Sequence, residues 1–391
     1  MRFAVLSHLL PPSATGQPVM LARLLSGVAA EIYCLIGLQG FHTPESGVSA
    51  TRALPAACHH LPRESRLRGA GRARLPMLDW HFRLRQRSRS LARVLKLEGA
   101  EAVVACSGDL LNIPAAFLAA RRLGVRVIAY YFDDYPLQWL TGAERRFASA
   151  WERRLIAAGG VFVAPNELLR DEVSRRGAKR TAIVRNPLPD DVAADAASAP
   201  WPAPGKGMNI VFAGAIYHAH ADAFRNLLTA MEIVADLQPR LRIFTAQPEA
   251  DLRALGLVGG RVDRLGHLPE REAQQALREA DVLFLPLAFA SPISEVIRTS
   301  SPGKLADYLA SGRPVLVHAP ADSFSVWYAK RNECAWVADR PDPQLLAAVL
   351  RQIAADPVRR RRIASHGVAC ARRDFAPALA RQALLDAVGV R

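Results

Sequence analysis

Short runs of consecutive apolar residues alternate with helix-like segments along most of this 391-residue chain. In the first half the apolar runs are RFAVLS, EIYCLIGL, AVVACS, RVIAYYF and GVFVAPN, and AIVRNPLP closes the series. Strands that are apolar throughout and separated by helices are typical of a parallel sheet with helices on both faces. The alternation therefore predicts a doubly wound α/β fold.

The alternation stops once and then restarts. Residues 191–207 are rich in alanine, proline, aspartate and glycine and show no apolar period, which is typical of a linker. After them come NIVFAGAIY, LRIFTAQ, RVDRLGHL, DVLFLPLAF, PVLVHAP and CAWVAD, again with helical segments between them. We therefore predict two Rossmann-like domains in tandem, residues 1–190 and 208–368, followed by a helical segment at 369–391. Ligands of such sheets bind beyond the carboxyl ends of the strands.

The composition of the chain indicates which ligands and which cellular compartment suit the protein. The formal net charge of +15 favours phosphorylated ligands, anionic lipid or nucleic acid as partners. Five cysteines lack a paired spacing, which favours a reduced, cytosolic protein over a disulfide scaffold or a zinc site. No apolar run reaches the roughly 18 to 20 residues that a membrane span needs. We interpret the N-terminus as a first strand rather than a signal peptide.

The stretch SSPGKLADYLASG has the features of a helix that binds an anion at its start. A serine cap, Pro302 in the first turn and Gly303 leave free amides and the positive end of the helix dipole in front. Lys304 adds a full charge there, and Asp307 follows about one turn deeper, where it can accept hydrogen bonds from sugar hydroxyls. The pattern indicates a site for a nucleoside diphosphate, and the alternative is a well-capped structural helix.

This helix and its surroundings, ADVLFLPLAFASPISEVIRTSSPGKLADYLASGRPVLV, resemble the donor site of GT-B glycosyltransferases, particularly those of family 4, or group 1, and their relatives. LSHLLPPSATGQPVMLARLL resembles their N-terminal loop and first helix, and VAPNELLRDEVSRRGAKRTAIVRNPLP resembles the passage that closes their first domain. RRDFAPALARQALLDAV resembles their closing helix, which packs back toward the N-terminal domain. The resemblance covers nearly the whole chain in order.

The resemblance implies a nucleotide sugar on the C-terminal domain, an acceptor on the N-terminal domain and a cleft between them. It implies neither metal nor cofactor, because helix amides and basic side chains neutralise the diphosphate leaving group. It also implies retention of the anomeric configuration. By position, Asp307 corresponds to the ribose ligand. The residues that fall at the diphosphate are Thr15, Gly16, Ser301, Gly303 and Lys304.

Two departures from the family's pattern affect the donor site. The family pairs two glutamates eight positions apart, but a threonine stands eight positions before Asp307, so Glu295 is the nearest candidate to contact the transferred sugar. The family's basic residue after the glycine of the first C-terminal strand is missing after Gly214, so that Arg298 or Lys304 is expected to supply this charge.

Further candidates for the donor pocket follow other strands. Arg264 and His267 fall where such enzymes hold the nucleobase, unless they belong to a solvated loop. Tyr217 is expected to line the donor pocket together with His218 and His220. The two histidines lack an obvious third ligand, so we predict no metal site.

In the N-terminal domain, AYYFDDYPLQW places Asp133 and Asp134 at the end of a strand. Either carboxylate can take the proton of an acceptor hydroxyl or orient the acceptor, and a helix cap or a turn is the alternative. His8 ends the first strand and either faces the cleft or is structural.

Between Arg63 and Lys96 the chain is dense in arginine, with Leu78, Trp80 and Phe82 interspersed. Arginines on lipid phosphates and aromatic side chains at headgroup level are typical of docking to an anionic membrane surface. The alternative is a solvated helical face or loop.

We therefore predict a cytoplasmic glycosyltransferase, peripheral on the inner membrane face. It would move a hexose from a nucleoside diphosphate sugar to a lipid-linked or saccharide acceptor in cell-surface glycan biosynthesis. A nucleotide-sugar epimerase of the same fold is one alternative. Another is a basic protein without enzymatic activity that binds lipid or nucleic acid, although the sequence has no nucleic-acid-binding motif and we expect no nucleic acid partner.

Overall fold

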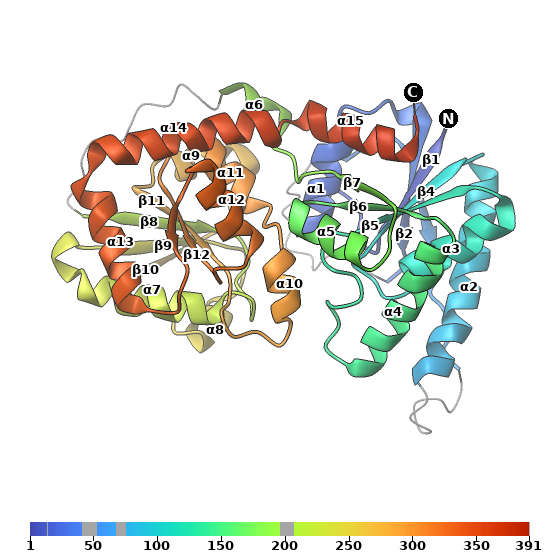
Figure 1. Ribbon diagram of the computed structural model, residues 1–391, viewed down its shortest axis with the longest axis horizontal. Coiled ribbons are helices and arrows are strands. Elements are labelled where there is room, and N and C mark those ends of the chain that lie inside the picture. Colours follow the sequence, from blue (N-terminus) through green and yellow to red (C-terminus); the bar gives the residue numbers. More distant parts are fainter. Residues whose placement is uncertain (14, 41–52, 68–75, 196–206, 391) are drawn as a thin grey trace. The chain divides into compact units, whose positions relative to one another are not determined.

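The computed structural model describes residues 1–13, 15–40, 53–67, 76–195 and 207–390 (Figure 1). The chain divides into two compact units. Unit 1 comprises Met1–Asn186 and Ala378–Arg391, and unit 2 comprises Pro187–Pro377. Each unit contains one parallel β-sheet with helices around it, which confirms the prediction of two doubly wound α/β domains.

Unit 1 has a seven-stranded sheet in the order β3-β2-β1-β4-β5-β6-β7, and every pair of neighbouring strands is parallel. The apolar runs predict β1, β2, β4, β5 and β6, the closing run AIVRNPLP reaches only the last two residues of β7, and no run predicts β3. This edge strand carries two histidines and mostly exposed side chains, so no apolar run marks it. The strands are β1 (Phe3–Leu6), β2 (Tyr33–Leu38), β3 (Ala57–Leu61), β4 (Ala102–Cys106), β5 (Arg126–Tyr130), β6 (Val161–Ala164) and β7 (Arg180–Ile183).

Helices cover both faces of this sheet. They are α1 (Gly16–Leu25), η1 (Ala30–Ile32), α2 (Pro76–Leu97), α3 (Asn112–Leu123), α4 (Gly142–Ala157), α5 (Glu167–Arg175) and α15 (Pro377–Val388). Along β1, Ala4 and Leu6 belong to the core that α2 to α5 cover, whereas Phe3 and Val5 belong to the core that α1 and α15 cover. Both faces of β1 are therefore buried, which explains why the strand is apolar throughout.

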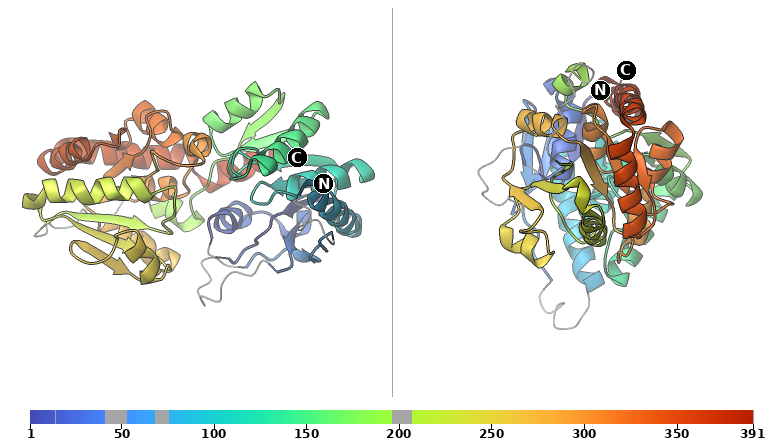
Figure 2. Two further views of the ribbon diagram at one scale, coloured as in Figure 1. Left: turned by 90° about the horizontal axis from the view of Figure 1, so that it is seen from below. Right: turned by 90° about the vertical axis from the view of Figure 1, so that its left-hand side faces the viewer.

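Unit 2 has a six-stranded parallel sheet in the order β10-β9-β8-β11-β12-β13. The strands are β8 (Asn209–Ala213), β9 (Arg240–Phe244), β10 (Val262–Leu265), β11 (Val282–Pro286), β12 (Val315–His318) and β13 (Trp336–Ala338). The helices are α6 (Asp190–Asp195), α7 (Ala221–Ile233), η2 (Ala235–Leu237), α8 (Glu249–Ala254), α9 (Glu270–Arg278), α10 (Ser294–Thr299), α11 (Lys304–Ala310), α12 (Phe324–Asn332), α13 (Pro343–Ala355) and α14 (Pro357–Asp374). Two further views show the helices around each sheet (Figure 2).

The division into units falls near the expected domain boundaries but not on them. The first crossing lies at Asn186 and Pro187, and α6 occupies the start of the expected linker, whose residues 196–206 lie outside the described residues. Helix α14 continues through the expected boundary at residue 368, and the chain returns to unit 1 after Pro377. There α15 buries Ala380, Leu384 and Val388 in the core of unit 1.

The strand order reverses once in each sheet, between β1 and β4 in unit 1 and between β8 and β11 in unit 2. In open α/β sheets, the carboxyl ends of the strands at such a point are where ligands bind. The loops after β1, β4, β8 and β11 are therefore where a site is expected. Among the helices of the described residues, none combines the length and the hydropathy that a membrane span requires.

Candidate functional site

Unit 2 brings two of the predicted donor-site residues together at the carboxyl end of β8. Gly214 follows β8 with a φ of +126°, and a Cβ atom at this position would lie 2.5 Å from Cε and 2.9 Å from Nζ of Lys304. The end of the Lys304 side chain therefore packs directly on the backbone of Gly214. Its Nζ atom also lies 5.1 Å from the centre of the Phe212 ring. A lysine from α11 thus supplies the charge that the sequence lacks directly after Gly214.

Helix α11 is fixed to β8 by a second contact. The hydroxyl of the buried Tyr308 accepts a hydrogen bond from the amide of Ala213 at 3.0 Å. The helix begins at Lys304, so Pro302 lies before it and not in its first turn as the sequence predicts. A tight turn, in which the carbonyl of Pro302 accepts from the amide of Leu305 at 3.0 Å, leads into the helix. Because α11 is short, the charge of Lys304 contributes more to an anion site than the helix dipole does.

The surroundings of Lys304 destabilise the charged form of its side chain. Desolvation lowers the pKa of Lys304 to about 8, although the nearby Asp307 carboxylate acts in the opposite direction. A desolvated ammonium group gains most from an anionic partner, because that partner replaces the water that the group has lost. The geometry and the shifted pKa therefore indicate an anion site at Gly214 and Lys304.

Asp307 lies one helical turn after the start of α11 and is half-buried. The side-chain amide of Gln274, from α9, donates a hydrogen bond to its Oδ1 atom at 3.4 Å. This hydrogen bond links the carboxylate, which lies near Lys304 on the same helix, to α9.

Several buried polar atoms near this edge of the sheet have no hydrogen-bond partner among the described residues. They are Nδ1 of His220, Oδ1 of Asp222, Nε2 of His267 and Oε1 of Gln274. Each belongs to the loop after β8 or β10, or to the helix that follows it. A buried polar atom without a partner costs about 1–3 kcal/mol, and native proteins contain few of them. Such atoms occur elsewhere among the described residues as well, and a polar ligand at the carboxyl ends of these strands would give these four a partner.

The loop after β8 forms an aromatic cluster. The rings of Tyr217 and His220 lie 4.5 Å apart, and the rings of Phe212 and His220 lie 6.0 Å apart. Burial, and then the charges of Lys304 and His218, lower the pKa of His220 to about 3. His220 is therefore neutral at pH 7 and can exchange hydrogen bonds with a ligand without adding charge. Tyr217 is 52% exposed, so its ring is available as a surface for a ligand.

Arg264 lies in β10, next to its last residue, and His267 follows this strand. The guanidinium of Arg264 donates two hydrogen bonds to the carbonyl of Gln247, at 3.1 and 2.7 Å. The side chain of Gln247 in turn accepts from the amide of Ile216 at 2.6 Å and donates to its carbonyl at 2.9 Å. Arg264 is thus linked through Gln247 to the loop after Gly214.

Glu295 and Arg298 lie on α10, which follows the loop after β11. Asp222 fixes this loop, because its Oδ2 atom accepts hydrogen bonds from the amides of Phe289 and Ala290 at 3.0 and 2.7 Å. Glu295 is exposed and Arg298 is half-buried. Glu295 therefore stands on an anchored segment and is accessible to a ligand.

In unit 1, the two neighbouring aspartates have different environments. Asp134 is fully buried, and its two oxygens accept hydrogen bonds from the guanidinium of Arg176 at 3.0 and 2.7 Å. Arg176 also lies 3.4 Å from Glu152, which accepts a hydrogen bond from Tyr131 at 3.0 Å. Asp134 therefore ties the C-terminal end of α5 to the segment that follows β5, which is a structural task.

Asp133 is half-buried beside the end of β4. Its carbonyl accepts a 3.4 Å hydrogen bond from Ser107, whose hydroxyl also accepts from the amide of Phe132 at 3.0 Å. Burial, and then the charge of Asp134, raise the pKa of Asp133 to about 6. A carboxylate with this pKa is ionised at pH 7 and still basic enough to take a proton.

Two family models match the sequence. A glycosyl transferase 4-like domain matches residues 26–189, and a glycosyl transferase-like model matches residues 208–386. Together they extend over most of both units. The chain is a glycosyltransferase with a GT-B fold. No curated protein matches the sequence.

Solved structures agree with the fold of this glycosyltransferase. Trehalose-6-phosphate synthase OtsA matches with a TM-score of 0.70 at 14% identity, over 100% of this chain and 99% of that chain. HepE of Anabaena, in complex with UDP and glucose, matches with a TM-score of 0.66 at 12% identity over 100% of both chains. The lipopolysaccharide outer core galactosyltransferase WaaB matches with a TM-score of 0.65 at 13% identity, over 100% of this chain and 99% of that chain. At these identities the likeness shows the fold alone.

In unit 1 of the glycosyltransferase, the strand order reverses between β1 and β4, and we call the carboxyl ends of these two strands the switch point of unit 1. A Cβ atom on Gly108 would lie 2.3 Å from Cε1 of His8 and 2.5 Å from Oε1 of Gln17. Only a glycine therefore lets the His8 ring lie on this loop. Gln17 donates to the hydroxyl of Ser7 at 2.7 Å, which ties the start of α1 to the end of β1.

Thr15 and Gly16, the residues expected to approach the diphosphate, begin the same helix. Thr15 is the N-cap residue of α1, and its hydroxyl lies 3.2 Å from that of Ser13. A Cβ atom at Gly16 would meet no atom within 4 Å. The space above the start of α1 is therefore open, as an approach to a ligand requires.

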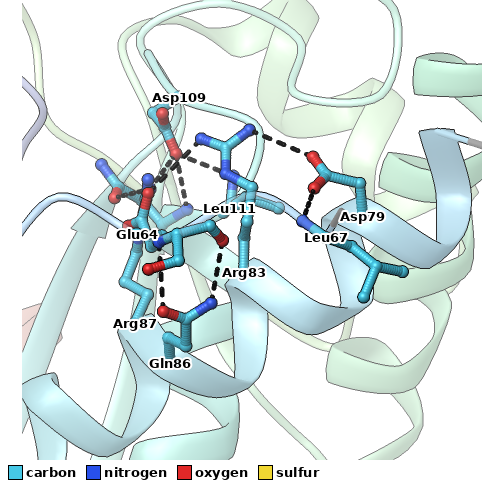
Figure 3. Close-up of polar contacts among 10 residues, drawn as sticks. Glu64, Leu67, Asp79, Arg83, Gln86, Arg87, Asp109 and Leu111 are labelled. Carbon is cyan, nitrogen blue, oxygen red and sulfur yellow. Dashed lines mark hydrogen bonds and ion pairs between the residues drawn. The ribbon is translucent and has the colours of Figure 1, made fainter. Parts of the chain in front are cut away.

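A buried ion-pair network of the glycosyltransferase contacts the loop after β4 at Asp109 (Figure 3). The side chain of Arg87, on α2, is 1% exposed and forms ion pairs with Glu64 and Asp109. It also donates to Oδ1 of Asn112 at 2.9 Å. Oδ1 of Asp109 accepts in turn from the amide of Leu111 at 2.8 Å, so that the network fixes the loop after β4 and the start of α3.

This network corrects part of the interpretation of the basic segment Arg63–Lys96. Arg87 is buried, and the half-buried Arg83 lies 3.4 Å from Glu64 and 3.9 Å from Asp79, so both arginines pair with carboxylates of the protein itself. Trp80 also faces inward, with its ring 5.4 Å from that of Phe147. Residues 68–75 of this segment lie outside the described residues.

Sequence reasoning missed Gln247, Gln274, Asp222 and Gly108. Gly108 and Asp222 had a weak signal, since each belongs to a segment that follows a strand. The two glutamines had none, because their contacts join segments that are distant along the chain.

Proposed function

We propose that this glycosyltransferase moves a hexose from a UDP sugar to a lipid-linked or saccharide acceptor in cell-surface glycan biosynthesis. The observation that carries the proposal is the Lys304 ammonium group on the backbone of Gly214. The structures of HepE with UDP and with UDP and glucose support the choice of a uridine nucleotide. The acceptor class rests on the basic surface of α2 and on the resemblance to WaaB.

Lys304 contributes chiefly by stabilising the leaving group. In the proposed reaction, the bond between the sugar C1 atom and the phosphate oxygen breaks while the acceptor oxygen bonds to C1. Negative charge then grows on the diphosphate, and a preorganised cation stabilises that charge without reorganisation of water. This chemistry needs neither metal nor cofactor, and we propose that the enzyme uses none.

The remaining donor groups have separate tasks in this proposal. Asp307 accepts hydrogen bonds from the ribose hydroxyls, and Arg264 and His267 contact the nucleobase. Tyr217 lines the pocket, and Glu295 contacts the transferred sugar. The residues of unit 2 that complete the diphosphate site with Lys304 are Gly214, Arg298, Ser301 and Gly303, and the family resemblance adds Thr15 and Gly16 to the residues expected to approach the phosphates.

Asp133 is the proposed group for the acceptor. Its raised pKa, about 6, suits a carboxylate that receives the proton of the acceptor hydroxyl as the new bond forms. We propose transfer with retention of configuration, on the resemblance to family 4, so that the acceptor oxygen bonds to C1 on the same face from which the diphosphate departs. The configuration of the product, read by NMR, tests this point.

The central test measures UDP release with and without acceptor. A transferase releases UDP from a UDP sugar in proportion to the acceptor added, whereas an epimerase changes the sugar without an acceptor. The glycosyltransferase family models do not favour the epimerase. A thermal-shift panel of UDP, GDP and ADP sugars identifies the nucleotide, because a ligand that binds the folded state raises the apparent stability.

Donor binding should depend on pH through Lys304. The protonated lysine binds the diphosphate, and its pKa in the free protein is about 8. We therefore expect the affinity for UDP-glucose to be constant below pH 7 and to fall about tenfold between pH 7 and pH 9, since the lysine loses its proton over this range. Titration calorimetry at several pH values measures this. In Lys304→Arg the fall should be absent, and a flat profile for the wild type would contradict the role of Lys304.

Helix α2 offers one face for docking to an anionic membrane. Leu84, Leu91 and Leu95 are buried against the core, whereas Leu78 and Phe82 are 53% and 40% exposed. The exposed side chains that continue this outer face are Arg85, Arg89, Arg93 and Lys96. Apolar groups at one end of a helical face and cations along it fit the headgroup region of an anionic bilayer. We propose that the enzyme is cytoplasmic and docks on the inner membrane face through this surface.

Charge reversal on α2 should weaken membrane binding. We expect the double variant Arg85→Glu and Arg89→Glu to bind phosphatidylglycerol vesicles at least about thirtyfold more weakly, because each basic residue near such a surface contributes about 1 kcal/mol and each glutamate is repelled. Vesicle sedimentation at low salt measures the change. The matched control is Arg361→Glu with Arg362→Glu, two exposed arginines of α14. Equal weakening in both double variants would show a non-specific effect of net charge.

A further inference from the structure

Helix α9 carries a glutamine where its buried face is otherwise apolar. Gln274 is 6% exposed and lies one turn before Leu277, which is 3% exposed. The neighbouring Gln275 is exposed to solvent. A buried amide costs free energy unless its groups are hydrogen-bonded, so the burial of Gln274 requires a reason.

The contact that the described residues show for this amide is with Asp307. Nε2 of Gln274 donates to Oδ1 of Asp307 at 3.4 Å, and Oε1 is buried without a partner among the described residues. An ionised carboxylate only accepts hydrogen bonds, so the NH₂ group is the end of the amide that faces it. The side chain therefore serves the carboxylate and leaves its own oxygen unsatisfied.

The position of α9 relative to α11 is fixed independently. Arg313, which is 2% exposed and follows α11, donates from Nε to the carbonyl of Arg278 at the end of α9. Gln274 thus reaches Asp307 from a helix that is anchored one turn further on. The same segment of chain carries His267, whose Nε2 is also buried without a partner among the described residues. A polar ligand against this segment would give both of these atoms a partner.

We propose that Gln274 is a positioning residue of the ribose subsite: it orients the Asp307 carboxylate toward the ribose hydroxyls and so makes the enzyme select ribonucleotide over deoxyribonucleotide donors. The proposal rests on the proposed function, in which Asp307 binds the ribose. A carboxylate that is free to rotate loses the directed hydrogen bonds to a hydroxyl pair, whereas a fixed one keeps them. A site that is built to bind a hydroxyl group rejects a ligand that lacks this hydroxyl, because the polar group of the protein is then left unpaired.

The test compares nucleotides that differ in one hydroxyl. Titration calorimetry gives the affinities of UDP, 2′-deoxy-UDP and 3′-deoxy-UDP for the full-length wild type and for Gln274→Met, which keeps the length of the side chain but removes the amide. We expect the wild type to prefer UDP over at least one deoxy form by about 10- to 100-fold, the usual effect of leaving one buried hydrogen-bonding group unpaired. In Gln274→Met this preference should fall at least about fivefold, while the affinity for that deoxy form stays within about twofold.

The neighbouring glutamine provides the matched control. Gln275→Met changes the same residue type one position away on the exposed face, and it should keep the wild-type preference. An equal loss of affinity for all three nucleotides in Gln274→Met would overturn the proposal and show a general effect on the fold. A preference unchanged from the wild type would also overturn it. If the wild type binds no UDP, the proposed function fails together with this inference, whereas binding of UDP without loss of preference in Gln274→Met defeats the inference alone.

The last measurement tests whether Gln274 acts through Asp307. Asp307→Asn should lower the preference for UDP by itself, and adding Gln274→Met to it should have little further effect, because Gln274 acts through Asp307. Additive effects of the two substitutions would overturn the positioning role. Gln274→Leu repeats the measurement with a branched side chain, so that the result does not depend on one variant folding well.

Discussion

Replacing Lys304 with methionine should remove the thermal shift that the best UDP sugar produces in the wild type. The ammonium group is expected to pair with the diphosphate in a desolvated place, and truncating one partner of such a pair costs about 2–5 kcal/mol. We therefore expect the affinity to fall by at least about thirtyfold. Because methionine packs on Gly214 and Phe212 much as the lysine stem does, the fold should be kept. The thermal shift and calorimetry with UDP-glucose measure the two effects.

The control for this variant is Lys330→Met, a lysine of the same unit that pairs with Asp339 at 2.6 Å and is exposed. It should bind the donor as the wild type does. Lys304→Met with an undiminished thermal shift would place the diphosphate elsewhere and remove the basis of the proposed function.

The variant Gly214→Ala tests the contact between Gly214 and Lys304 by changing the glycine. Its Cβ atom would overlap Lys304 at 2.5 Å, so the side chain must leave the carboxyl end of β8. Gly256 also has a positive φ, +73°, but a Cβ atom there would meet no atom within 4 Å. Gly256→Ala therefore reports the cost of the backbone conformation alone. We expect both variants to lose stability and only Gly214→Ala to lose donor binding.

The relation between Gly214 and Lys304 shows what the sequence could and could not predict. The sequence predicted that each residue belongs to a donor site, Gly214 through the family resemblance and Lys304 because it begins a helix after a glycine. It could not say that the two touch, because their contact depends on how α11 packs on β8. The missing basic residue after Gly214 was consequently an open question until the packing placed Lys304 there.

Other differences have the same cause. The strands with two buried faces were predictable, since burial on both sides forces apolar residues at every position. The edge strand β3 was not, because one neighbour and mostly exposed side chains leave no such constraint. Arg87 could not be distinguished from Arg85 or Arg89 by composition, yet it alone of the three is buried, beside Glu64 and Asp109. Partners in space, which a local pattern does not contain, decide the role of each arginine.

The adjacent aspartates give the clearest separation of roles, and two substitutions of equal size test it. Asp133→Asn should lower kcat by about 10²- to 10⁴-fold, the usual contribution of a positioned general base, and leave the affinity for UDP-glucose within about twofold. In the wild type, activity should fall about tenfold for each pH unit below pH 6, because Asp133, with a pKa of about 6, then takes up a proton. This limb of the pH profile should be absent from the residual activity of Asp133→Asn.

Asp134→Asn should act on stability instead. Its carboxylate compensates Arg176 in a buried pair, and breaking such a pair costs about 3–5 kcal/mol. We expect the low end of this range, since Glu152 remains 3.4 Å from Arg176 and retains part of the compensation. A lower Tm with kcat within severalfold of the wild type would establish the structural role. Because the two carboxylates are neighbours and the substitutions remove the same charge, only their different environments can produce opposite outcomes. Full activity in both variants would therefore exclude a carboxylate at this position from the chemistry and leave proton transfer to another group of unit 1 or to the departing phosphate.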